Sequence, residues 1–136
     1  MKPLWLVTDG ASRGNPGEAG IAYMILDEAG NVLGQHAECI GRATNNEAEY
    51  RALILGLRAA GRLGTGHLTW ISDSEVTVFQ MQGKYRVSKK HLRLLHAEAM
   101  KATEDFAHVF MEHHRREDPR IVAVDALVNR ALDECM

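Results

Sequence analysis

The sequence predicts an α/β protein with a mixed β-sheet and helices on its faces. Two observations lead to this prediction. Five short apolar runs, bounded by turn residues, are typical of strands, and four stretches with apolar residues at helical spacing are typical of helices. These segments follow one another in the order βββαβααβα. Such an order favours an initial antiparallel meander, followed by strands that alternate with helices.

The first three strands are expected within residues 4–40. The apolar run Leu4–Thr8 stops at Asp9-Gly10 and is typical of a buried strand. The segment GASRGNPGEAG carries four glycines and one proline, so we expect a loop before the second strand, Ile21–Leu26. Residues 27–31 have turn chemistry, and the third strand is expected over Val32–Ile40.

The remaining elements follow from capping residues and periodicity. Thr44-Asn45-Asn46 supplies cap residues for a helix that ends near Gly61 or Gly64. Strands are expected at Leu68–Ser72 and Val109–Glu112. Three further helices are expected over Ser74–Met81, after a cap at Ser88, and over about Val124–Leu132.

Size and composition predict one domain over residues 1–136. A hydrophobic fraction of 46% and a charged fraction of 25% are ordinary for a globular protein. The net charge of −2 gives no global basic field, so a nucleic-acid partner would need a local basic patch. No signal peptide or membrane span is recognisable, and we expect a cytoplasmic monomer without a membrane or an obligate protein partner.

Cys39 and Cys135 form no metal or redox motif, and reduced thiols are favoured over a disulfide.

Four carboxylates stand where a predicted strand or helix begins or ends: Asp9, Glu49, Asp73 and Asp125. Each has a simpler explanation as a turn or capping residue. A capping role in the first turn, favoured by the helix dipole, accounts for Glu47, whereas Glu49 faces inward beside Ala52 and Leu53. Gathered by the fold, the four groups would form an oxygen-only site that suits Mg²⁺ or Mn²⁺, the metals of phosphodiester chemistry.

The segments DGASRGNPGEAG, TNNEAEYRAL, SDSE and VDALVNRAL, in this order, resemble the four signature blocks of the type I ribonuclease H family. The segment GKYRVSKKHLRLL is similar to compact members that lack a basic protrusion. The resemblance implies a ribonuclease H-like fold, with three antiparallel strands and then two parallel ones. It also implies an endoribonuclease that binds RNA/DNA hybrids and cleaves the RNA strand, leaving a 5′-phosphate and a 3′-hydroxyl.

The resemblance also assigns roles to individual residues. The four acids would hold two Mg²⁺ ions, with Mn²⁺ as the alternative metal and Asp9 as the bridging ligand. Residues that resemble contacts to ribose hydroxyls, groove edges or the DNA-strand phosphate are Ser12, Asn15, Thr44, Asn45 and Asn46. Such amide and hydroxyl groups recognise sugar identity without recognising sequence.

Three assignments remain open in the sequence. The family has an asparagine shortly before its last aspartate, where this chain has Ile121-Val122-Ala123-Val124, so Asp118 is the alternative to Asp125. His113 and His114 lie near the place of a product-release histidine, but a structural role at a strand end is favoured. The basic residues of Lys84–Arg93 are either a solvated surface or a patch that follows a DNA backbone.

Two other classes of function compete with hydrolysis of a hybrid. One is a hybrid-binding module without turnover, which would not need all four acids. The other is a DNA-directed nuclease on the same scaffold, which would not need Asn15, Asn45 and Asn46 to recognise ribose. Comparing cleavage of hybrid, duplex DNA and duplex RNA distinguishes these alternatives.

Overall fold

The computed structural model describes residues 2–135 and has the predicted order of elements. The strands are β1 (Leu4–Arg13), β2 (Gly17–Leu26), β3 (Val32–Ala43), β4 (His67–Ser72) and β5 (His108–His113). The helices are α1 (Asn45–Leu63), α2 (Glu75–Met81), α3 (Lys90–Thr103) and α4 (Pro119–Glu134).

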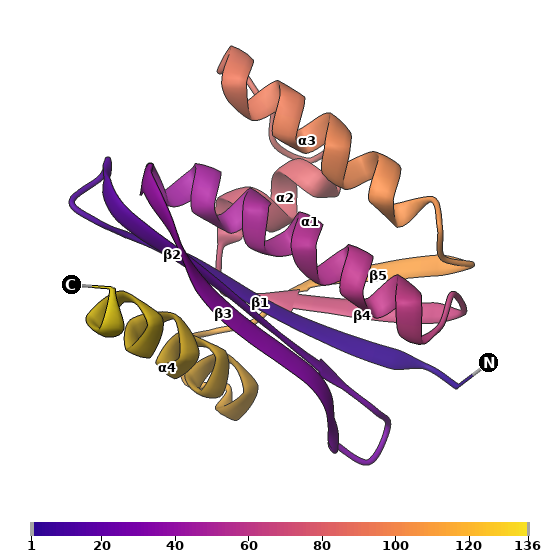
Figure 1. The fold of residues 1–136 in the computed structure, drawn as a ribbon. Coiled ribbons are helices and arrows are strands. Elements are labelled where there is room, and N and C mark those ends of the chain that lie inside the picture. Colours follow the sequence, from indigo (N-terminus) through magenta and orange to yellow (C-terminus); the bar gives the residue numbers. More distant parts are fainter. Residues whose placement is uncertain (1, 136) are drawn as a thin grey trace.

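All five strands form one mixed sheet in the order β3-β2-β1-β4-β5 (Figure 1). Strands β1, β2 and β3 pair as an antiparallel meander, and β4 and β5 add to it in parallel. The predicted mixed sheet is therefore confirmed. Because β1 is central and its residues Leu4–Val7 pair in parallel with β4, the carboxyl end of β4 lies beside the middle of β1, around Asp9. Ends of parallel strands are where α/β sheets place their ligands.

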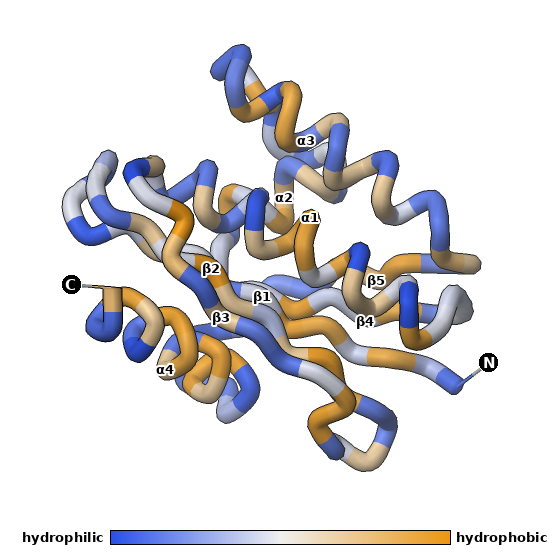
Figure 2. The backbone as a smooth tube through the Cα atoms, viewed as in Figure 1, coloured by the Kyte–Doolittle hydropathy of each residue, from blue (hydrophilic) through white to orange (hydrophobic). Residues whose placement is uncertain are grey.

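Helices cover both faces of the sheet. Figure 1 shows α1, with α2 and α3 beyond it, on one face, and α4 on the opposite face. The α1 side buries Leu6, Leu53 and Trp70, while α4 buries Val124 and Val128 against the other face. The tube in Figure 2 is correspondingly hydrophobic along the central strands and mixed along the helices. None of the described helices combines the length and apolar character needed to cross a membrane.

The glycine-rich segment is shorter as a loop than the sequence suggests. Strand β1 continues to Arg13 and β2 begins at Gly17, so only residues 14–16 form the turn. Gly10 explains the difference. A Cβ atom at this position would lie 2.3 Å from the backbone carbonyl carbon of Ala48 in α1. This glycine therefore permits close packing of strand against helix, rather than marking a loop.

Two helix starts also differ from prediction. Helix α4 begins at Pro119, and not near Val124, because the Asp118 side chain accepts a hydrogen bond from Arg120 N–H and proline fits the first turn. Asp125 consequently lies in the second turn of α4 and does not open the helix. Helix α3 begins after Lys89, which makes no side-chain cap, so Ser88 is not its capping residue.

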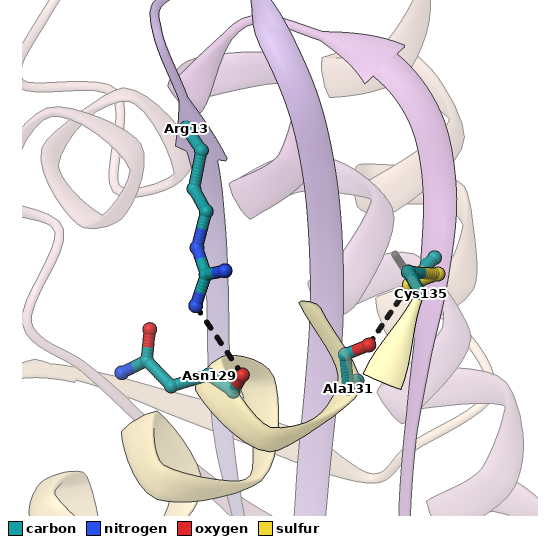
Figure 3. The surroundings of a disulfide bond; sticks show 5 residues. Arg13, Asn129, Ala131 and Cys135 are labelled. Carbon is teal, nitrogen blue, oxygen red and sulfur yellow. Dashed lines mark hydrogen bonds between the residues drawn. A yellow bond between two sulfur atoms is a disulfide. The ribbon is translucent and has the colours of Figure 1, made fainter. Parts of the chain in front are cut away.

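The expectation of two reduced thiols is wrong, because Cys39 of β3 and Cys135 after α4 form a disulfide. Their sequence separation of 96 hides the fact that α4 packs beside β3. Figure 3 shows Arg13 reaching from β1 to the same end of α4, where its guanidinium contacts the carbonyl oxygen of Asn129. The guanidinium also pairs with the carboxylate of Asp133 at 2.6 Å. The carboxyl end of α4 is thus tied to two strands.

We predict that Cys39→Ser lowers the free energy of unfolding by about 2–4 kcal/mol, because a cross-link over a long loop restricts the unfolded chain. The measurement is thermal unfolding of the oxidised protein, the reduced protein and the variant. The last two should melt at the same, lower temperature. Two titratable thiols in the unfolded, unreduced protein would contradict the prediction.

Candidate active site

Three of the four predicted acids meet where the carboxyl end of β4 lies beside the middle of β1. Asp9 lies in β1, Asp73 directly follows β4, and Glu49 lies near the start of α1. One carboxylate oxygen from each lies within 4.8 Å of the other two. Asp9 and Glu49 are buried, with exposed fractions of 5% and 9%. Three different elements therefore place like charges close together in a site of low exposure.

Local packing explains how Glu49 reaches the strands. Thr44 caps α1, and its side chain and that of Glu47 form a capping box. This confirms the expected capping role of Glu47. Since Gly10 has no side chain, the first turns of α1 lie directly against β1, and Gly10 N–H donates a 2.8 Å hydrogen bond to Glu49 Oε1. Ser74, which caps α2, also hydrogen-bonds Glu49.

Asp125 reaches the same pocket from the opposite helical layer. Its carboxyl group forms a hydrogen bond with that of Asp9, and Asn129 Nδ2 donates to its Oδ2 at 3.2 Å. Asp125 is not part of the set of three that lie within 4.8 Å of one another. The alternative residue, Asp118, is instead engaged as the cap of α4 and as a partner of Arg120.

Burial and mutual repulsion hold protons on these carboxyl groups. Burial, followed by the charge of Asp73 and the hydrogen bond with Asp125, raises the pKa of Asp9 to about 8. Burial and then the charges of Asp9 and Asp73 raise the pKa of Glu49 well above its usual value. Burial also raises the pKa of Asp73, against the opposing effect of Arg116. The cluster is therefore unstable as a set of bare anions and suits cations.

Arg116 is a site residue that the sequence analysis did not identify. It lines a cavity of about 340 Å³ together with all four acids, Gly10, Ala11 and Asn45. Within residues 2–135 it is the one basic side chain lining this cavity. Its sequence context, HHRREDPR, contains several cations and gives no indication of which one turns toward the acids. Only the fold places Arg116 beside Asp73.

The amides expected to contact nucleic acid lie beside the acidic cavity in a connected network. Ser12 N–H donates to Asn45 Oδ1 at 2.7 Å, and Asn45 N–H donates to Asn15 Oδ1 at 2.9 Å. Ser12 Oγ also donates to the carbonyl oxygen of Ala43. Because both amide oxygens accept protein hydrogen bonds, the amide NH₂ groups of Asn15 and Asn45 are the ends available for a ligand.

The other predicted binding residues have different surroundings. Thr44 is engaged in the capping box, and Asn46 is the second residue of α1 and is half-buried. The basic side chains of the Lys84–Arg93 stretch are all exposed. Lys84 Nζ lies 5.1 Å from the centre of the Phe79 ring, and Tyr85 donates to Glu75. Both interpretations of this stretch remain predictions.

A carboxylate cluster in the middle of β1 and at the end of β4, on a β3-β2-β1-β4-β5 sheet, defines a protein of the ribonuclease H-like class. Comparison with known proteins agrees. The family model described as reverse transcriptase-like matches residues 7–131. Ribonuclease HI of Halobacterium salinarum is 36% identical over 126 residues, which are 93% of this chain and 62% of that protein.

Solved structures give the same result. The N-terminal RNase H domain of a Mycobacterium tuberculosis protein has a TM-score of 0.93 at 36% identity, covering 98% of this chain and 96% of that one. RNase H1 of H. salinarum has a TM-score of 0.91 at 34% identity, covering 97% and 98%. The chain belongs to the ribonuclease H family. It spans about a third of the length of several curated mycobacterial relatives, to which it is 39% identical.

We predict that Asp9→Asn raises the melting temperature of the metal-free protein, and that the difference grows as pH rises from 4 to 8. The raised pKa of Asp9 means that the folded protein retains a proton that the unfolded chain loses near pH 4. Wild-type stability therefore falls by up to about 1.4 kcal/mol per pH unit through this range, and the variant avoids that loss. Thermal unfolding in EDTA at several pH values measures this.

The matched control is Asp105→Asn, because Asp105 is exposed and lies outside the acidic cavity. Its melting temperature should follow that of the wild type at every pH. A melting difference for Asp9→Asn that stays constant with pH, or becomes negative near pH 8, would contradict the assigned electrostatics.

Proposed function

We propose that this chain is an endoribonuclease that hydrolyses the RNA strand of RNA/DNA hybrids with two divalent cations. One observation carries the proposal: three carboxylates within 4.8 Å of one another, in a cavity that the fourth acid also lines. Family membership supports it. A ribonuclease H1 solved in complex with an RNA/DNA hybrid has a TM-score of 0.91 at 36% identity, covering 97% of this chain.

The residues present fit a pair of Mg²⁺ ions. The donor set is oxygen-only, and its acids have raised pKa values that a bound cation would reverse. Asp9, Glu49, Asp73 and Asp125 would hold the ions, with Asp9 shared because its carboxyl group interacts with those of the three other acids. When bound, such ions activate water as a nucleophile and stabilise the leaving oxygen. Mn²⁺ is the alternative metal with the same ligand preference.

Arg116 and the asparagines position the substrate in this proposal. The guanidinium of Arg116 faces the acids and is suited to hold a phosphate of the cleaved strand at the cavity. The free NH₂ groups of Asn15 and Asn45 can donate to ribose hydroxyls across the wide minor groove of a hybrid. These contacts recognise sugars rather than bases, so cleavage is independent of sequence. Attack of water on phosphorus with departure of the 3′-oxygen leaves a 5′-phosphate and a 3′-hydroxyl.

Hydrolysis is favoured over the two alternatives. A module that only binds hybrids has no use for buried acids whose mutual repulsion costs stability. A DNA-directed nuclease has no use for amide donors directed toward ribose.

We propose a monomer without an obligate protein partner. Incubating the protein with labelled hybrid, duplex DNA and duplex RNA in Mg²⁺ tests the proposal, which requires cleavage of the hybrid first and fastest.

We predict that Glu49→Gln lowers hybrid cleavage at least about 100-fold, since it removes a charge that holds the cations. The measurement is the initial rate of cleavage of a labelled hybrid in Mg²⁺. Glu47→Gln is the matched control, two residues away on the same helix. Glutamine at this position can still accept the hydrogen bond from Thr44 N–H, so this variant should remain folded and retain cleavage within about threefold. Equal losses in both variants would refute the assignment of Glu49.

A further inference from the structure

Four ionisable side chains lie close together where β5 leads into α4, on either side of Arg116 in the sequence. Glu112 is near the end of β5, His114 follows the strand, Asp118 caps α4, and Arg120 lies in its first turn. The imidazole of His114 joins two carboxylates: its Nδ1 lies 2.9 Å from Asp118 Oδ2, and its Nε2 lies 2.8 Å from Glu112 Oε1. We call this group the His114 clamp.

The clamp closes a loop of three residues, 115–117. His114 N–H donates to the carbonyl oxygen of Ser72 at 3.0 Å, which fixes the start of the loop on β4. Asp118 N–H donates to the carbonyl oxygen of Arg115, and Arg120 pairs with the Asp118 carboxylate at 3.0 Å, which fixes its end on α4. Both ends of the loop are therefore attached to elements that also carry site acids.

Partial burial makes these contacts persistent. The side chain of Asp118 is 14% exposed and that of His114 is 28% exposed. The hydrogen bond from Arg120 is the largest of the effects that hold the pKa of Asp118 well below its usual value, so this carboxylate remains charged. Capping of α4 and the ion pair with Arg120 would suffice to start the helix. The hydrogen bond between His114 and Asp118 is not needed for that start. It joins the two ends of the loop 115–117.

Arg116 is at the middle of this closed loop and lines the acidic cavity. A loop of three residues with both ends fixed holds the Arg116 backbone in place, so its side chain starts from one defined position. We propose that His114 is a positioning residue, which holds the loop so that the Arg116 guanidinium faces the cavity and contacts the substrate phosphate. This inference rests on the proposed function, and it assigns to His114 no contact with the substrate.

The test is a double-mutant cycle with His114→Ala, Arg116→Ala and the double variant. Values of kcat and KM come from cleavage of a labelled hybrid in Mg²⁺. Affinity comes from fluorescence anisotropy of the same hybrid in Ca²⁺. If His114 acts through Arg116, His114→Ala lowers hybrid affinity and kcat/KM about fivefold or more, and the double variant is no worse than Arg116→Ala alone. Effects that multiply, or no effect of His114→Ala, would overturn the inference.

Conservative variants separate positioning from folding. His114→Asn keeps a donor near the place of Nδ1, so it can still reach Asp118 and should recover most of the lost affinity. His114→Gln can reach only Glu112, does not close the loop, and should recover little. Recovery by glutamine instead of asparagine, or by neither, would contradict the proposal. Thermal unfolding establishes that each variant is folded at the assay temperature.

His36→Ala is the matched control, since His36 Nε2 also faces a carboxylate, that of Glu38 at 3.8 Å, but on β3 outside the acidic cavity. It should leave both cleavage and hybrid affinity unchanged, and an equal loss there would refute a specific role for His114.

A wild-type protein that binds the hybrid without cleaving it refutes the proposed function alone, because the anisotropy cycle still measures coupling between His114 and Arg116. A wild-type protein that neither binds nor cleaves refutes both.

Discussion

Repulsion among buried carboxylates is the constraint on which the rest of this structure depends. Asp9, Glu49 and Asp73 would separate in a flexible chain, and the fold holds them within 4.8 Å. Parallel pairing of β1 and β4 brings Asp9 and Asp73 together. Because Gly10 has no side chain, α1 packs closely on β1 and brings Glu49 to them. The unfavourable electrostatics are local, while the packing that opposes them is spread over two apolar layers. The acidic site lowers the stability of the fold and the packed core raises it, as is common for proteins with functional sites.

The helical layer formed by α4 completes the site from the other face of the sheet. It contributes Asp125, and the loop before it contributes Arg116. Its position is defined at both ends: by the disulfide of Cys39 and the ion pair of Arg13 near its carboxyl end, and by the contacts of Asp118 at its start. The sheet thus provides a fixed acidic centre. The last segment provides a fourth acid and a cation whose placement depends on how firmly α4 is held.

Much of the fold was predictable because its signals are local. Apolar runs and the capping pattern of Thr44 and Glu47 identify strands and a helix without tertiary information. What escaped prediction depends on contacts between distant segments. Gly10 indicates a loop until α1 is seen to pack on it. The start of α4 is an exception, because its signal, Asp118-Pro119, is local and competes only with the later apolar run that begins near Val124. The disulfide and the orientation of Arg116 depend on where α4 lies, which no spacing in the sequence encodes.

The central claim is that cations offset the repulsion among these acids. The most direct test is anomalous diffraction from crystals of the protein soaked in Mn²⁺. The account predicts at least one manganese peak about 2.2 Å from carboxylate oxygens of Asp9 and of Glu49 or Asp73. Manganese bound only at other acids, with the Asp9 carboxylate free of metal at saturating concentration, would contradict it.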